Sequence, residues 1–285
     1  MASSVSNRSD VLSGTRVLPT ATARRVTPRR RGYVLPILSM PMLVLLGLPL
    51  LALVLRLDVT DLRQNLASPT VLRALSLSLV TATVTAALAL LLGTPLAYLL
   101  ARRTFRGRRI VDTLVDLPMV LPPAVAGIAL LLVFGRRGML GASLDAAGIS
   151  IVFTPVAVVL AQLFVAAPFY IRSAAAGFAE IDGELEQAAA LDGAGDFAVF
   201  RHVTAALAWP AIVGGIVMTW ARALGEFGAT IIFAGNFPGR TQTMPLAIYL
   251  GFERNLDLAV TLAFLLLAAS FTVLLVVHWS LSRRA

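Results

Sequence analysis

Six long stretches without a charged residue are the feature that most limits how this chain of 285 residues can fold. Each is about as long as a helix that crosses a bilayer, which needs roughly 20 apolar residues. The stretches cover residues 32–55, 74–101, 117–135, 146–171, 203–221 and 258–277. With 58% hydrophobic and 14% charged residues, the chain is too apolar for an ordinary soluble domain. The sequence therefore predicts an all-α, polytopic membrane protein with about six transmembrane helices.

The third stretch contains a double proline, Pro122-Pro123, inside the apolar run. Proline lacks the N–H group that continues a helix, and its ring clashes with the preceding turn. We therefore expect this span to be broken or bent at that point.

Several kinds of chemistry are missing from the sequence. All 24 basic residues are Arg, and the lack of Lys excludes a Walker-type phosphate loop, which needs Gly-Lys-Ser/Thr. Any work done with ATP must then come from a partner protein. The chain has no Cys, and its two His residues, His202 and His278, lie far apart in the sequence. We therefore predict no catalytic residues, no metal ligands and no bound cofactor.

The arginines set the predicted orientation in the membrane. Seven lie in residues 1–31, which are predicted to form a disordered basic cytoplasmic tail that contacts membrane lipid and no nucleic acid. The apolar run behind the tail is too long for a signal peptide, so we expect it to be retained. With the N-terminus inside and Arg222 left out, cytoplasmic segments carry sixteen arginines and outer segments seven, which favours cytoplasmic N- and C-termini. The predicted parts are the tail, a first transmembrane helix with an outer loop at 32–72, and a transmembrane domain at 73–285.

Residues 179–212 form a polar interruption with six acidic side chains between two apolar runs. Asp182 is a candidate cap for a short helix with Ala188 and Ala189 on a small face, and Gly193 is a candidate end for it. Asp196 is a candidate cap for a second helix, on which Phe197, Phe200 and Val203 share one side at spacings of three. The composition alone fits either a docking surface or a solvated connector.

Residues 187–206 resemble the EAA loop of ABC-importer permeases, which reads Glu-Ala-Ala, three residues, Gly, nine residues and Ile-x-Leu-Pro. Ala188, Ala189 and Gly193 match this spacing. Gln187 replaces the Glu, although Glu186 is adjacent, Val203 replaces the Ile, and Ala205-Ala206 replace the Leu-Pro. The resemblance implies that residues 173–205 form a cytoplasmic coupling loop for ABC ATPase subunits. Its contact residues would be Glu186, Gln187, Ala188, Ala189 and Gly193.

After the fifth apolar stretch come two shorter apolar pieces, 227–239 and 241–252, each about half the length of a span. Arg222 and Glu226 are four residues apart, so they can pair on one helix face, and such a pair at membrane depth must face protein or a water-filled path. Residues 236–239 predict a turn. Arg240 and the hydroxyl and amide groups of 241–243 suit a tetrahedral oxyanion. The chemistry fits either a substrate path or an interfacial loop with one structural salt bridge.

The same stretch resembles the molybdate/tungstate ABC permease family. The shared sequence is Ala-Arg-Ala-Leu-Gly-Glu-Phe-Gly-Ala-Thr at 221–230, Phe-Ala-Gly-Asn at 233–236, Gly-Arg-Thr-Gln-Thr at 239–243 and Pro-Leu-Ala-Ile-Tyr at 245–249. The resemblance implies a homodimer of the type I importer fold in the plasma membrane of a prokaryote. It also implies two ATPase subunits, an extracytoplasmic oxyanion-binding protein and transport by alternating access. We place Arg222, Glu226, Asn236, Arg240 and Thr241 along the translocation pathway as a hypothesis.

Three alternatives stay open at this point. A sulfate or thiosulfate permease of the same architecture would carry an oxyanion of the same shape and charge. A secondary transporter driven by an ion gradient predicts ionisable relays within the spans, and Arg222 and Glu226 are the only candidates in the sequence. An intramembrane enzyme would need a nucleophile with a base or a metal site, and the sequence shows neither.

Overall fold

The computed structural model describes residues 34–282, and all regular elements in that range are helices. This confirms the predicted all-α class, while the basic tail at 1–31 lies outside the described residues. The chain divides into two compact units between Pro49 and Leu50, within helix α1 (Val34–Leu55). In the first unit, the side chains at 37–49 of α1 are exposed and almost all apolar, which suits a helix surrounded by lipid.

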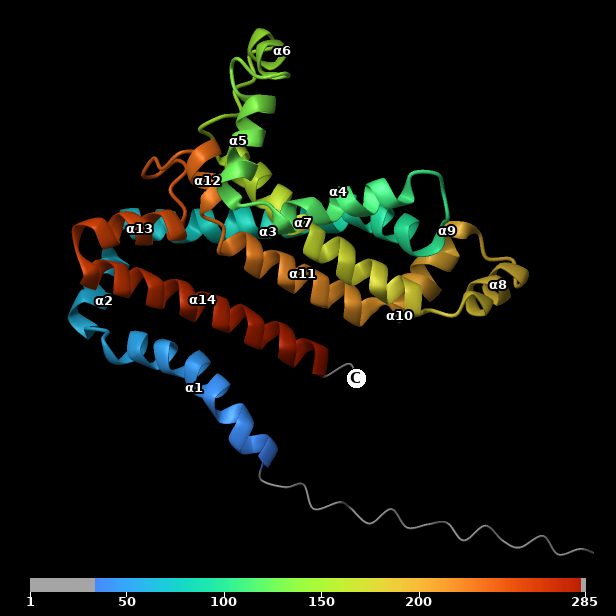
Figure 1. Ribbon diagram of the computed structural model, residues 1–285, viewed down its shortest axis with the longest axis horizontal. Coiled ribbons are helices and arrows are strands. Elements are labelled where there is room, and N and C mark those ends of the chain that lie inside the picture. The colour runs from blue at the N-terminus through green and yellow to red at the C-terminus, as the bar shows by residue number, and fades with distance from the viewer. Residues whose placement is uncertain (1–33, 283–285) are drawn as a thin grey trace, which may run out of the picture. The chain divides into compact units, whose positions relative to one another are not determined.

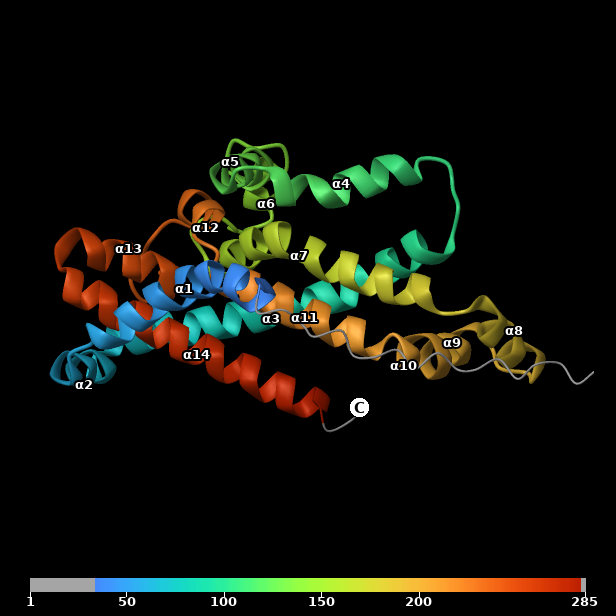
Figure 2. The ribbon, with the colours of Figure 1, turned by 60° about the horizontal axis from the view of Figure 1, so that its bottom comes forward.

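Three long helices form the centre of the second unit. They are α3 (Pro69–Arg102), α7 (Pro155–Glu180) and α11 (Trp209–Leu224), which pack side by side (Figures 1 and 2). Small residues make the close approach possible. A Cβ atom added to Gly215 of α11 would lie 2.9 Å from the Cβ of Ser173 in α7. Helices in a membrane associate largely through such close van der Waals contact, because lipid supplies no hydrophobic driving force between them.

Four helices in the described range are long and apolar enough to cross a membrane: Ile37–Leu55, Pro69–Arg102, Pro155–Glu180 and Leu256–Val276. The number rises to six if each of two bent helix pairs is one span. This agrees with the prediction of about six spans, of which the third and the fifth are bent pairs of helices. The fifth bends by 74° between Asp196–Leu207 and Trp209–Leu224, where Pro210 has no N–H group to continue the preceding helix.

The double proline breaks the third span, as predicted. Helix α4 (Arg108–Val120) and helix α5 (Pro123–Phe134) meet at 117°. Figure 2 shows α4 running alongside α7, and Arg172 of α7 binds it there. The Arg172 guanidinium donates from Nε to Asp116 at 2.6 Å and from Nη1 to Asp112 at 2.9 Å. Helix α4 is thus fixed to α7 by two ion pairs.

The predicted fourth span begins too early in the sequence. The short helix α6 (Gly141–Ala146) is followed by a loop, and α7 begins at Pro155, where Thr154 accepts a hydrogen bond from Ala157 N. The helix then continues through Arg172 to Glu180. The stretch 146–154 is apolar but contains turn residues, including Gly148 and Phe153, whose φ angles are +73° and +63°. Hydropathy alone therefore placed a helix where the backbone turns.

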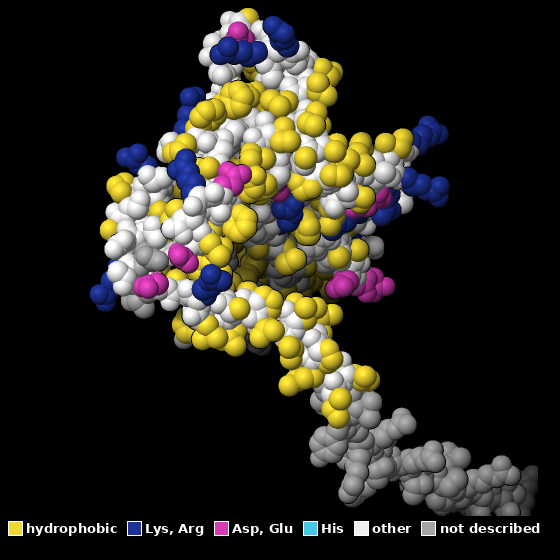
Figure 3. All heavy atoms as spheres, turned by 60° about the vertical axis from the view of Figure 1, so that its left-hand side comes forward, with side chains coloured by type: hydrophobic (Ala, Val, Ile, Leu, Met, Phe, Trp, Pro, Cys, Tyr) yellow, Lys and Arg dark blue, Asp and Glu magenta, His cyan; other side chains and the backbone are white. Residues whose placement is uncertain are grey.

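Outside the segment between α7 and α11, the remaining helices are α2 (Val59–Ala67), α12 (Gly228–Phe233), α13 (Met244–Arg254) and α14 (Leu256–Ser282). The two half-length pieces predicted for 227–252 correspond to α12 and α13. Helix α13 packs on α14, and its first residue, Met244, donates its N–H to Ser78 Oγ of α3 at 2.7 Å. Figure 3 shows hydrophobic side chains spread over much of the displayed face, as expected for a surface in contact with lipid.

Candidate functional site

The polar segment between α7 and α11 folds into two short helical pieces. The first is α8 (Gly183–Leu191), which Asp182 caps by accepting a hydrogen bond from Glu184 N at 3.0 Å. Gly193 ends it with φ +90°, a conformation that side chains with a Cβ rarely adopt. The N–H groups of Gly193 and Ala194 bond to the carbonyls of Ala190 and Ala189, each at 3.1 Å, as in a Schellman motif. The predicted cap and the predicted end of this helix are both confirmed.

The second piece differs from the prediction. It consists of α9 (Asp196–Val199), a π-helical turn η1 (Phe200–Thr204) and α10 (Ala205–Leu207). Gly195 occupies the cap position, and the Asp196 side chain makes no capping bond. Of the three residues expected on one side, Phe197 is 74% exposed and Phe200 and Val203 are half-buried, and Phe197 and Phe200 line the same pocket. Val199 and Thr204 are the buried residues of this piece, and Phe200 packs against the core.

The predicted contact residues of α8 point in different directions. Gln187 and Ala188 are exposed, Ala189 is half-buried, and Gly193 is exposed. Leu191, at the end of the helix, is 89% exposed. An outward face that combines small residues with uncovered apolar side chains can accept another protein closely.

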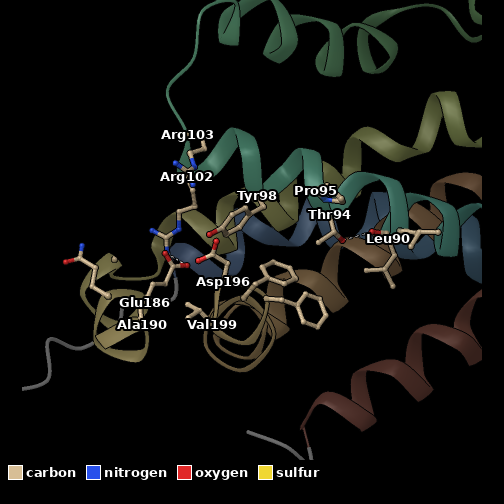
Figure 4. Close-up of a pocket in the computed structure, with 15 residues that line it drawn as sticks. Leu90, Thr94, Pro95, Tyr98, Arg102, Arg103, Glu186, Ala190, Asp196 and Val199 are labelled. Carbon is tan, nitrogen blue, oxygen red and sulfur yellow. Dashed lines mark hydrogen bonds and ion pairs between the residues drawn. The ribbon is translucent and has the colours of Figure 1, made fainter. Parts of the chain in front are cut away.

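Glu186, in contrast, faces the chain's own spans. Its Oε1 accepts a hydrogen bond from Thr204 Oγ1 at 2.5 Å and lies 3.3 Å from Arg102 Nη2. Arg102 is the last residue of α3, and Thr204 is fully buried in η1. One carboxylate oxygen therefore joins α8 to α3 and to η1. Figure 4 shows Arg102 and Glu186 together, with Asp196 on the same side of the pocket.

These polar residues line one wall of a pocket of about 980 Å³. Leu90, Leu91 and Pro95 of α3 line its apolar part. Beside it, Tyr98, Phe178 and Phe200 form a cluster of aromatic rings with centroids 5.4–6.0 Å apart. Sequence reasoning missed Arg102 and Thr204. The available signal for Arg102 was its position directly after the apolar run at 74–101, where a cation meets the membrane surface.

A second group of predicted site residues lies at the other end of α11. Arg222 Nη1 and Glu226 Oε2 are 2.7 Å apart, which confirms that the two residues pair. The Glu226 side chain is 1% exposed and that of Arg222 is 30% exposed. Glu226 Oε1 also accepts a hydrogen bond from Ala229 N at 2.9 Å, in the first turn of α12. The carboxylate thus holds the end of α11 to the start of α12.

The remaining predicted residues lie in the turn between α12 and α13, which confirms the turn predicted there. Arg240 is exposed and lines a pocket of about 450 Å³ together with Arg136. Thr241 is fully buried, and its Oγ1 accepts a hydrogen bond from Phe237 N at 3.1 Å. Asn236 Oδ1 is buried without a hydrogen-bond partner in the described residues. Neither Arg222 nor Glu226 lines the pocket of Arg240, so these five residues do not form one site in a single chain.

Comparisons with known proteins agree with this architecture. The model of a family described as binding-protein-dependent transport system inner membrane component matches residues 93–283. The molybdenum transport system permease protein ModB of Mycobacterium tuberculosis (strain ATCC 25618 / H37Rv) is 43% identical over 233 residues, which are 82% of this chain and 88% of that protein. The molybdate/tungstate transport system permease protein WtpB of Thermococcus kodakarensis (strain ATCC BAA-918 / JCM 12380 / KOD1) is 37% identical over 227 residues, 80% of this chain and 85% of that protein.

Among solved structures, a bacterial ABC transporter involved in the import of the acidic polysaccharide alginate matches with a TM-score of 0.71. The match covers 89% of this chain and 96% of that chain at 17% sequence identity, so it shows a shared fold. The chain therefore belongs to the family of inner membrane components of binding-protein-dependent transport systems. It is a multi-pass membrane protein with the fold of an ABC importer permease.

Proposed function

We propose that this chain is the permease subunit of an ATP-driven importer that carries molybdate or tungstate across the plasma membrane. The observation that carries the proposal is the 43% identity, over 82% of the chain, to a permease named for molybdenum transport. In this proposal the chain makes and breaks no covalent bonds. Its work is a shift between inward- and outward-facing states, biased by substrate delivery on one side and by ATP on the other.

The proposed orientation has both termini in the cytoplasm. The packing supports this sorting of segments, because residues assigned to the same side lie together. At one end of the bundle, Arg102 meets Glu186. At the other, Arg136 and Arg240 line one pocket, and Gly239 lies against Arg73. The arginine bias then assigns the end with Arg102 to the cytoplasm.

The cytoplasmic segment 173–205 is proposed as the coupling loop on which ABC ATPase subunits dock. The support is the outward face of α8, where Gln187 and Ala188 are exposed and Ala189 is half-buried. Small side chains let a helix enter a partner's groove closely, and Gly193 sets the direction of the chain behind it. A second copy of the chain completes the membrane part of the importer.

The outer end is proposed to receive the oxyanion from an extracytoplasmic binding protein. Arg222 and Glu226 hold α11 against α12 at this end, and Asn236, Arg240 and Thr241 follow in the adjoining turn. Arg240 offers an exposed cation to an approaching oxyanion. Thr241 has its hydroxyl oxygen engaged by the turn, so its part is to hold the shape of the turn.

Uptake by the reconstituted importer tests the proposed substrate. Proteoliposomes would contain the permease, the ATPase subunits and the binding protein, with radiolabelled molybdate outside and ATP inside. Unlabelled tungstate should compete with the label, while an equal excess of sulfate should not. Efficient competition by sulfate and thiosulfate would identify the alternative oxyanion permease. Uptake driven by an ion gradient without ATP would indicate a secondary transporter.

Two substitutions test the coupling loop. Ala189→Glu adds volume and charge on the outward face of α8, and Gly193→Val places a branched side chain at φ +90°, with no atom within 4 Å of its Cβ to clash. Both variants should reach the membrane at normal levels but lose uptake, because the ATPase subunits dissociate or hydrolyse ATP without stimulation by the binding protein. If both variants keep the ATPase subunits and full uptake, α8 is not the docking element.

A further inference from the structure

Three parts of the cytoplasmic end meet at the carboxylate of Glu186, although they are far apart in the sequence. Helix α3 contributes Arg102, α8 contributes Glu186 and η1 contributes Thr204. We propose that Arg102 is a positioning residue that carries displacement of the α8 segment to the spanning helix α3, with Glu186, and not Gln187, as its partner. This inference rests on the proposed function of α8 as the docking element for the ATPase.

Glu186 can connect α8 to the spanning helices because both of its contacts are with residues outside α8. Its Oε1 accepts from Thr204 at 2.5 Å and faces Arg102 Nη2 at 3.3 Å, and its side chain is 19% exposed. Gln187, one residue on, is exposed and makes no hydrogen bond or ion pair among those described. Two adjacent residues on a helix point about 100° apart, so Gln187 can face the ATPase while Glu186 faces the spanning helices. A movement of α8 therefore displaces the Glu186 carboxylate relative to Arg102 and Thr204.

Arg102 is placed to pass that movement on. It is the last residue of α3, a helix that packs against both α7 and α11. Its side chain is 17% exposed, yet its Nε and Nη2 atoms are buried and make no hydrogen bond in the described residues. Nη2 lies at ion-pair distance from Glu186, but neither Nη2 nor Nε donates a hydrogen bond to it. A small shift of α8 therefore changes the distance between Glu186 and the largely buried Arg102 guanidinium. Loss of the partner of a buried charge has a large free-energy cost.

The π-helical turn η1 provides a second connection between Glu186 and the spanning helices. Thr204 is the last residue of η1, and α10 and α11 follow it in the chain. Single π turns within helices are frequently found at functional sites. Through Arg102 and Thr204, one carboxylate reaches two of the three central helices.

The experiment compares variants in the complete importer, with binding protein and molybdate present. For each variant, the measured quantity is the ratio of stimulated to basal ATP hydrolysis per assembled complex, together with co-purification of the ATPase subunits. Arg102→Gln removes the cation, Arg102→Lys keeps it, and Thr204→Val removes the hydroxyl while keeping the shape. Arg103→Gln is the matched control, because Arg103 lines the same pocket but is exposed and has no ion pair among the described residues.

We expect Arg102→Gln to lower the ratio about fivefold or more, the lower end of the coupling between distant sites in proteins. Thr204→Val should lower it too, while Arg102→Lys and Arg103→Gln should keep it near the wild-type value. Basal hydrolysis and co-purification should stay unchanged in all four variants.

Equal ratios for Arg102→Gln and Arg103→Gln would overturn the inference. So would a variant that loses assembly or thermal stability but keeps the wild-type ratio in the complexes that form, because that is the mark of a purely structural role. Ala189→Glu in the same assay separates the two proposals. If it uncouples the importer while Arg102→Gln does not, only the part assigned to Arg102 is wrong. If it also leaves coupling intact, the docking proposal for α8 fails.

Discussion

The ion pair between Arg222 and Glu226 allows a quantitative prediction for the end of α11 that meets α12. The Glu226 side chain is 1% exposed, so Arg222→Leu leaves a carboxylate buried without its cation. Removing one partner of a buried pair costs about 3–5 kcal/mol. Arg222 itself is 30% exposed, and Ala229 N still donates to Glu226, so we expect a cost of about 3 kcal/mol, the lower end of that range.

Matched variants isolate the charge. Arg222→Leu combined with Glu226→Gln removes both charges but keeps an acceptor for Ala229 N, so it should be less destabilised than Arg222→Leu alone. Glu226→Gln alone leaves Arg222 with access to water and should cost roughly 1 kcal/mol. The expected order of stability is wild type, then the double variant and Glu226→Gln, and last Arg222→Leu.

Apparent melting temperatures of the detergent-solubilised permease, taken at one fixed heating rate, measure this order, since membrane proteins often unfold irreversibly. A loss of about 3 kcal/mol corresponds to a decrease of roughly 6–12 °C for a domain of this size. If Arg222→Leu melts no lower than the double variant, Glu226 is not an uncompensated buried charge and the pair is solvated. The role of the pair in holding α11 to α12 would then have to be abandoned.

Three further predictions concern topology, energy supply and helix packing. In the Cys-free background, Ala188→Cys should react with a membrane-impermeant thiol reagent only from the cytoplasmic side and Arg136→Cys only from outside; the reverse pattern would invert the orientation. The purified chain alone should hydrolyse no ATP, because it lacks the Lys of a phosphate loop, and hydrolysis above the level of a mock preparation would contradict this. Gly215→Ala should destabilise the bundle by about 1–3 kcal/mol through overpacking against Ser173, whereas Gly214→Ala, whose added Cβ meets no atom closer than 4.0 Å, should be neutral; equal melting temperatures would argue against the tight contact.

The apolar runs predicted most of the helices because a backbone in lipid must satisfy its own hydrogen bonds, which leaves little choice but a helix. The run at 258–277 corresponds to α14, and that at 74–101 to α3. The predicted helix boundaries are wrong where residues that turn or break the backbone lie within an apolar run. Gly148, Phe153 and Pro155 delay the start of α7, and Pro210 divides the fifth span. Hydropathy averages over such residues and so cannot place these boundaries.

The candidate sites were predicted only as far as local spacing reaches. Asp182, Gly193 and the Arg222–Glu226 pair depend on neighbours within a few residues, and the structure confirms their contacts. The regular spacing assumed for the second helix of this segment does not hold beyond Val199, because the π-helical turn η1 has a wider turn than an α-helix. The contact of Arg102 with Glu186 joins residues from different helices, and no local pattern contains it.

The break between α4 and α5 has a mechanical consequence. Pro122 and Pro123 have no N–H groups, so no hydrogen bond runs through the junction and its bending stiffness is low. Helix α4 is bound to α7 through Arg172, whereas a Cβ added to Gly127 of α5 would lie 2.8 Å from Ile232 of α12. We therefore expect a movement of α4 to bend this junction before it displaces α5. Helix α5 packs on α12, so we expect these two to move together, while the unbroken helices α3 and α7 connect the two ends of the bundle.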